Sequence, residues 1–211
     1  MANWSTISSL ATAGGTLILA LATFSSVRSA NRSARVAESA LQLNLRPLLF
    51  PSHDTDRTER IMWVDKHWAE VRGGRGSVEI EDGTIYLAMS LRNAGSGVAV
   101  LQAWHVVPRF TPAERAYPPL EEFRQQSRDL YVPAGDVGLW QGAIRDRDDP
   151  AHAPLVEAIE EPHIFNVTLL YSDHEGGQRT ISRFSLSPGE GSSWTCSVIR
   201  HWNLDRPDPR G

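Results

Sequence analysis

Two short clusters that combine histidine with acidic residues are the first candidates for chemistry in this chain. They are His53-Asp-Thr-Asp56 and Asp173-His-Glu175. Imidazole and carboxylate groups ligate metal ions, and they act as acids and bases, when a fold brings them together. Both clusters fall in expected turns, where Asp is common for backbone reasons, and neither has the spacing of a metal motif. The cluster Asp173, His174 and Glu175 nevertheless defines one hypothesis, a metal-dependent or acid/base hydrolase.

Other sequence patterns that could support catalysis or nucleotide binding are incomplete. Gly73-Gly-Arg-Gly76 lacks the Gly-Lys-Ser/Thr ending of a P-loop, and Asp146-Arg-Asp-Asp149 lacks the pattern of a calcium loop. The single cysteine, Cys196, lies in an alternating strand pattern, where a buried thiol is unreactive. We therefore assign no catalytic, cofactor-binding or metal-binding residue and no cofactor, and the sequence favours a non-enzymatic role over an enzyme.

Aromatic residues in polar segments are the candidates for contact with a partner. Trp63 and Trp68 flank Asp65-Lys66-His67 in an expected hairpin, and the segment 109–128 is a long insertion between strands. Exposed tryptophans contribute strongly to protein interfaces, although packing in the core is the alternative for each of them. The candidate partner-binding residues are Trp63, Lys66, Trp68, Tyr117 and Phe123.

The N-terminal segment predicts how these residues are placed relative to a membrane. Residues 1–27 carry no charged side chain, and a helix over residues 4–27 would be roughly 36 Å long against a ~30 Å hydrocarbon core. A cleaved signal peptide is the alternative, but no Lys or Arg precedes the apolar stretch. Arg28, Arg32 and Arg35 follow it, so we expect a single-pass cell-membrane protein with its N-terminus outside and its body in the cytoplasm.

Residues 28–46 read as a basic amphipathic neck helix with a net charge of +3, which Arg46-Pro47 ends. This helix could pack on the body, lie at the lipid surface or self-associate, so a homo-oligomer formed through the membrane and neck helices is one expectation. Residues 47–211 carry a net charge of -7, which argues against nucleic acid as a partner.

From Pro47 the hydrophobic pattern becomes alternating. Ile85, Leu87, Met89 and Leu91 share one face, with Tyr86, Ala88 and Ser90 on the other. Short strands recur with turn residues between them, and helical patterns occur only at 119–127 and 154–160. The fold class is therefore mainly β: an N-terminal transmembrane helix (1–27) continuing into the neck helix, an immunoglobulin-like antiparallel β-sandwich over 47–204, and a flexible tail at 205–211.

Three short sequences carry a resemblance to a known group: Leu45-Arg-Pro-Leu-Leu49 at the end of the neck, Leu91-Arg-Asn-Ala-Gly-Ser-Gly97, and Tyr171-Ser-Asp173. With the uncharged N-terminal span, they resemble uncharacterised bacterial single-pass membrane-anchored β-sandwich proteins. The resemblance implies a fold and a topology but no activity. We thus expect a non-enzymatic membrane-anchored protein, bound to the bilayer through residues 4–27, whose cytoplasmic β-sandwich binds or scaffolds a protein partner. The hydrolase and an extracytoplasmic binding domain are the alternatives.

Overall fold

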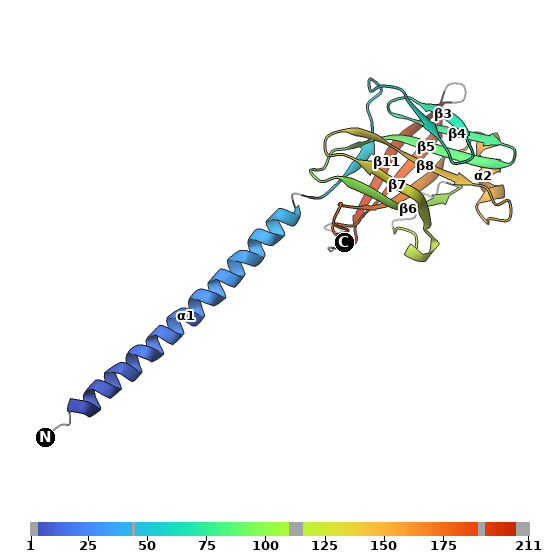
Figure 1. Cartoon of the computed structure of the whole chain (residues 1–211). Helices are drawn as coiled ribbons and strands as arrows, with labels where there is room; N and C mark the ends of the chain where they lie inside the picture. The colour runs from blue at the N-terminus through green and yellow to red at the C-terminus, as the bar shows by residue number, and fades with distance from the viewer. Residues whose placement is uncertain (1–3, 44, 110–115, 190–192, 206–211) are drawn as a thin grey trace. The chain divides into compact units, whose positions relative to one another are not determined.

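The computed structural model describes residues 4–43, 45–109, 116–189 and 193–205 (Figure 1). The chain divides into two compact units, Met1–Leu43 and Asn44–Gly211. Of the expected tail at 205–211, only Asp205 lies within the described residues, and its carboxylate pairs with Arg179 at 3.0 Å.

The first unit is a single helix, α1 (Trp4–Leu43). Its sequence is rich in Ala and Leu and contains no proline, which favours a continuous helix. The expectation that it crosses a membrane is wrong: among the described residues, no helix is both long and apolar enough to span a bilayer. The strongly apolar run covers only residues 17–24, between Ser-, Thr- and Gly-rich residues and the arginines, whereas a span needs about 20 predominantly apolar residues. This finding overturns the predicted single-pass localisation with a cytoplasmic body.

The second unit, the β domain, is mainly β. Its elements are β1 (Leu49–Pro51), β2 (Glu59–Met62), β3 (Trp68–Val71), β4 (Arg75–Glu81), β5 (Thr84–Asn93), β6 (Ala99–Val107), the 3-10 turn η1 (Leu120–Glu122), β7 (Arg124–Val132), β8 (Val137–Ile144), α2 (His152–Glu160), β9 (Phe165–Ser172), β10 (Thr180–Pro188) and β11 (Ser193–Asn203).

Most of these strands form one curled antiparallel sheet in the order β1-β5-β4-β11-β10-β9-β6-β7. Strand β8 lies off this path and also pairs with β5. The curl brings β7 next to β8 (Figure 1). Side chains connect these two strands: Gln126 Nε2 donates to the Gln141 carbonyl at 2.8 Å, and Arg128 donates to Gln141 Oε1 at 3.1 Å. A separate two-stranded sheet, β2–β3, packs against this framework.

Strand β5 divides its side chains between two faces as its alternating sequence predicts, and both faces are buried. The odd-numbered Ile85, Leu87, Met89 and Leu91 join the main core, together with Trp140, Phe165, Tyr171 and Phe184. The even-numbered Tyr86 and Ala88 join a second cluster with residues of β2 and β3. The small hairpin is therefore held over the face of β5 that the main core leaves uncovered.

One helical prediction is confirmed and one is wrong. Helix α2 occupies the expected segment near 154–160. The segment 119–127 instead forms the turn η1 and the start of β7, where Gln125 pairs with Ala103 of β6. Cross-strand pairing outweighs the helix propensity of its Glu, Gln and Arg residues, because propensity is worth only tenths of a kcal/mol per residue.

Candidate functional site

The β2–β3 hairpin holds three of the five residues that the sequence associates with partner binding. Met62 lies opposite Trp68 in its antiparallel register. In the connecting turn, the Lys66 amide donates to the Trp63 carbonyl and the Trp63 amide donates to the His67 carbonyl, each at 3.0 Å. Lys66 has a φ of 69°, so the loop ends in a left-handed residue, as three-residue hairpin loops commonly do. This geometry fixes which side chains point to each face.

The inner face of the hairpin is apolar and buried. Ile61, Trp63, Ala69 and Val71 pack against Tyr86 and Ala88 of β5. The Trp63 ring meets the Tyr86 ring edge-on at 5.2 Å, and Trp63 Nε1 donates to the Gly142 carbonyl of β8 at 3.1 Å. The buried indole thus has its polar atom satisfied, and it ties the hairpin to two strands of the main sheet.

The outer face of the hairpin exposes large apolar side chains. Val64 is 75% exposed, Trp68 52% and Met62 41%. The Arg60 guanidinium lies 5.2 Å from the centre of the Trp68 ring, a cation–π arrangement, and Arg60 Nε lies 3.7 Å from Glu70 Oε1. We call Arg60, Met62, Val64, Trp68 and Glu70 the hairpin face. It combines three exposed apolar side chains with one pair of opposite charges.

Beside the turn, the His67 imidazole lies between two carboxylates of β4. Its Nδ1 is 2.5 Å from Glu81 Oε2 and its Nε2 is 2.9 Å from Glu79 Oε2. The ring stacks on Tyr86, with centroids 3.9 Å apart and planes 14° from parallel, and only 10% of the side chain is exposed. We call His67, Glu79 and Glu81 the histidine bridge.

Asp65 forms a second polar contact between the turn and the sheet. Tyr86 donates to Asp65 Oδ2 at 2.9 Å, and Arg145 Nε donates to the same oxygen at 3.0 Å. Burial alone would raise the pKa of Asp65, but the hydrogen bonds from Tyr86 and Arg145 and the Arg145 charge outweigh it and lower that pKa. Burial and the Asp65 carboxylate raise the pKa of Tyr86. Asp65 therefore stays ionised and Tyr86 stays neutral around neutral pH.

The structure separates the five candidate partner-binding residues into exposed and buried ones. Lys66 and Trp68 are exposed on the hairpin, and Tyr117 is 39% exposed on a different part of the β domain. Trp63 and Phe123 are buried, so the expectation that they form part of a contact surface is wrong. Both side chains pack inside the β domain. Phe123 belongs to a separate cluster with Trp202, against whose ring Tyr117 packs at 5.9 Å.

The acidic and histidine clusters serve the backbone of their turns. Asp173 is buried, and its Oδ1 accepts hydrogen bonds from the amides of Glu175 at 3.0 Å and Gly177 at 2.9 Å. The His174 side chain is 52% exposed and lies 4.0 Å from the Glu175 carboxylate. In the other cluster, Asp56 accepts a hydrogen bond from the His53 amide at 2.7 Å.

Asp149 and Cys196, two further candidates from the sequence, also lack the surroundings that metal binding or catalysis needs. Within the described residues, no three His, Cys, Asp or Glu side chains gather in a way that could hold a metal ion. Asp149, from the calcium-like segment, pairs with Arg124 at 2.6 Å. Burial raises the pKa of the Cys196 thiol to about 12, so the thiolate that a nucleophile requires is not formed near neutral pH.

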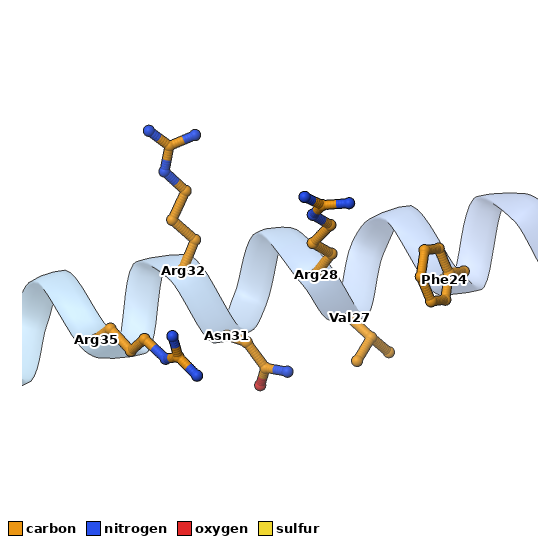
Figure 2. A pocket seen from close by; sticks show the side chains of 6 residues that line it. All are labelled: Phe24, Val27, Arg28, Asn31, Arg32 and Arg35. Atoms are coloured by element: carbon orange, nitrogen blue, oxygen red, sulfur yellow. The ribbon is translucent and has the colours of Figure 1, made fainter.

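Helix α1 has a shallow hollow along its own flank (Figure 2). Arg28 and Arg32 extend to one side of the helix, whereas Val27, Asn31 and Arg35 extend to the other. All of these side chains are exposed, and they come from one helix. The hollow therefore lacks the enclosing walls that ligand pockets usually have.

The sequence pointed to this hairpin through its tryptophans but did not reveal the histidine bridge. The only available signal was the alternation of Glu79 and Glu81 in β4, which places both carboxylates on one face of that strand. Comparison with known proteins adds no function: no family model matches the chain, and neither a curated protein nor a solved structure matches it.

Proposed function

We propose that the β domain is a non-enzymatic protein-binding module and that the hairpin face is its contact surface. One observation carries this proposal: Met62, Val64 and Trp68 are exposed together on a hairpin whose opposite face is buried. A surface that is fixed before binding loses little conformational entropy when a partner docks. The partner that fits it is a protein surface or segment with an apolar centre and charges complementary to Arg60 and Glu70.

The expected contribution of Trp68 is large enough to matter for affinity. Burying the exposed half of a Trp side chain removes on the order of 100 Å² of apolar surface from water, worth about 2.5 kcal/mol. Trp and Arg are also the residue types most enriched among interface residues of high energetic importance, and here Arg60 already lies over the Trp68 ring. The hairpin face therefore combines the two preferred types in one contact.

The hydrolase hypothesis receives less support from the structure. An acid/base role for Asp173 needs a carboxylate that can reach a substrate, but Asp173 is 4% exposed, and its Oδ1 accepts two amides of its own turn. The His174 side chain is 52% exposed and lies 4.0 Å from the Glu175 carboxylate, outside the hydrogen bonds that close the turn. We therefore retain protein binding as the function that the geometry supports best.

We also propose that the two-layered arrangement of hairpin and curled sheet belongs to the immunoglobulin-like class of β-sandwiches. The antiparallel pairing of the strands and the burial of both faces of β5 support this assignment. A solved structure of the β domain, compared strand by strand with immunoglobulin-like domains, would test it.

Photo-crosslinking from the edge of the hairpin face tests the binding proposal. A photoreactive residue replaces Glu70 in the full chain, which keeps Trp68 and Met62 intact, and cells expressing this chain are irradiated. We expect discrete protein adducts that disappear when Trp68→Ala is added. The matched control is Tyr131→Ala, because Tyr131 is an aromatic residue of similar exposure, 55%, on β7.

The adduct then provides a purified partner for titration. We expect Trp68→Ala to weaken binding by about 30-fold or more, as for a central interface residue, and Tyr131→Ala to leave it unchanged. Adducts of equal yield with and without Trp68 would contradict the proposal. Adducts between two copies of this chain would identify the partner as the protein itself.

A further inference from the structure

The position of the hairpin face depends on a histidine whose hydrogen bonds can all form in only one protonation state. Both ring nitrogens of His67 lie within hydrogen-bond distance of a carboxylate oxygen, Glu81 Oε2 on one side and Glu79 Oε2 on the other. An ionised carboxylate only accepts hydrogen bonds, and a neutral imidazole has one donor and one acceptor nitrogen. The observed arrangement therefore fits the doubly protonated imidazolium, which donates from both nitrogens.

The bridge is held in place from both sides. Ser77 donates to Glu79 Oε1 at 2.8 Å, which leaves Oε2 of that carboxylate for His67. The His67 ring stacks on Tyr86, at 3.9 Å between centroids, and also contacts Trp63, at 5.3 Å, whose ring meets Tyr86 in turn. With 10% of its side chain exposed, the imidazole has little water to replace a lost hydrogen bond.

The ionisable groups around His67 come from several elements: Glu79 and Glu81 of β4, Tyr86 of β5, Asp65 and Lys66 of the turn itself, and Arg145, which follows β8 and pairs with Asp65. The lowered pKa of Asp65 and the raised pKa of Tyr86 keep both of these groups in one charge state between pH 5 and 8. Lysine and arginine also keep their charge there. Histidine is the residue type whose charge normally changes within that range.

We propose that the histidine bridge is a pH-sensitive latch, which fixes the hairpin face while His67 is doubly protonated and releases it when His67 loses a proton. Deprotonation leaves a ring lone pair directed at a carboxylate, so one attraction becomes a repulsion. Trp68 follows His67 in the chain, and Val64 lies in the same turn, so both exposed residues move with the ring. The latch regulates the surface proposed above for partner binding, and its importance for binding rests on that proposal.

The left-handed Lys66 makes the turn responsive to this change. A non-glycine residue at a φ of 69° is less stable than in its preferred conformations by roughly 1–2 kcal/mol, so contacts elsewhere must hold the loop. Two backbone hydrogen bonds and the side-chain contacts of Asp65 and His67 do so. Removing the His67 contact takes away one of the few contacts that hold the loop closed.

Nuclear magnetic resonance of the full chain between pH 5.5 and 8 tests the latch without any partner. The readouts are the imidazole ¹⁵N resonances of His67, the Trp68 indole signal and the Val64 amide. We expect a doubly protonated His67 at pH 5.5, and we expect the Trp68 and Val64 signals to shift with the same midpoint as the ring. Hydrogen exchange of amides in 59–71, corrected for its intrinsic pH dependence, should accelerate about tenfold above that midpoint.

Three variants decide the assignment. His67→Gln should remove the pH response of Trp68 and Val64, and Glu81→Gln should move the midpoint to lower pH because it removes one charge that favours the imidazolium. His174→Gln, a change of the same type in the exposed turn at 173–177, should alter neither. The latch is overturned if Trp68 and Val64 titrate with a midpoint different from that of His67, or if their response persists in His67→Gln. Should His67→Gln fail to fold, the Glu81→Gln midpoint alone gives the same decision.

The two proposals can fail separately. If the Trp68→Ala cross-links persist while the pH response follows His67, the contact surface is wrong and the latch stands. If the cross-links disappear while the hairpin signals ignore His67, the surface stands and the latch is wrong.

Discussion

Two turns of the β domain each contain an aspartate and a histidine, and they bury different members of that pair. In the turn 63–67, the histidine is inside: His67 contacts Glu79 and Glu81 and is 10% exposed. In the turn 173–177, the aspartate is inside: Asp173 closes the loop through its backbone, and His174 is 52% exposed. The comparison shows that the turn decides whether its histidine is buried or exposed. A buried histidine can bridge two carboxylates, whereas an exposed one is mainly in contact with solvent.

The largest effect that tests this comparison is expected for Asp173→Ala. The variant removes two hydrogen bonds to a carboxylate and leaves the amides of Glu175 and Gly177 without their acceptor. We expect a loss of about 3 kcal/mol in the free energy of unfolding. Urea unfolding of the full chain measures it, and a cost near that of a surface substitution would show that the turn closes without Asp173.

The next effect compares the two histidines directly. We expect His67→Ala to cost about 2 kcal/mol, because it removes two charge-assisted contacts and buried ring packing, and His174→Ala to cost less than about 0.5 kcal/mol. Combining His67→Ala with Glu81→Ala should reveal a coupling of about 1 kcal/mol or less, since Glu81 is 62% exposed and partly screened. Equal costs for the two histidines would break the comparison.

A smaller effect concerns the left-handed residue in each turn. Gly176 has a φ of 80°, and an added Cβ would meet no atom within 4 Å, so Gly176→Ala should cost about 1 kcal/mol through backbone strain alone. Lys66 has a φ of 69°, so Lys66→Gly should relieve strain and raise stability by about 0.5 kcal/mol after the extra entropy of glycine in the unfolded chain. Thermal unfolding should show opposite signs for the two changes.

The smallest effect is the pH dependence that Asp65 adds to the hairpin turn. Because the folded-state pKa of Asp65 is lowered, its stabilising contribution is complete above the pKa of an unfolded Asp, about 3.9, and is lost as the pH falls through the folded-state value. Asp65→Asn should therefore be less stable than the natural chain at pH 7, and the difference should shrink by pH 3. Urea unfolding at both pH values checks the sign, and a difference that grew on acidification would contradict it.

Much of the strand framework is readable from the sequence, because successive side chains of a strand point to opposite faces of the sheet and a buried face requires apolar residues. The pattern 85–91 assigned Ile85, Leu87, Met89 and Leu91 to one face of β5 and Tyr86 and Ala88 to the other, which the structure confirms, but it did not show that both faces are buried. The segment 119–127 was missed because its pairing with β6, including Gln125 with Ala103, is non-local and contradicts its local propensity. The N-terminal helix was expected to span a membrane because residues 1–27 lack charge, but absence of charge is a weaker requirement than sustained apolarity.

The candidate site was predictable only in part, for geometric reasons. Trp63 and Trp68 both looked like contact residues, yet the turn places them on opposite faces of the hairpin, and only Trp68 is exposed. Their faces depend on the loop type, which in turn depends on the conformation of Lys66. The His67 contacts with Glu79 and Glu81 arise from packing the hairpin beside β4, which no local sequence pattern encodes.

The pairing of β4 with β11 also affects how the protein can be made. Ser77 of β4 lies opposite Ser193 of β11, so on the order of a hundred residues must be synthesised after β4 before its partner strand exists. At ribosomal rates of about 5–20 residues per second, that interval lasts roughly 5–20 s. During it, the edge of β4 that β11 later covers remains open, and an open edge can pair with another chain. During this interval the open edge of β4 can pair with other newly made chains. The yield of folded protein therefore depends on a chaperone that covers the edge, or on a low concentration of such chains.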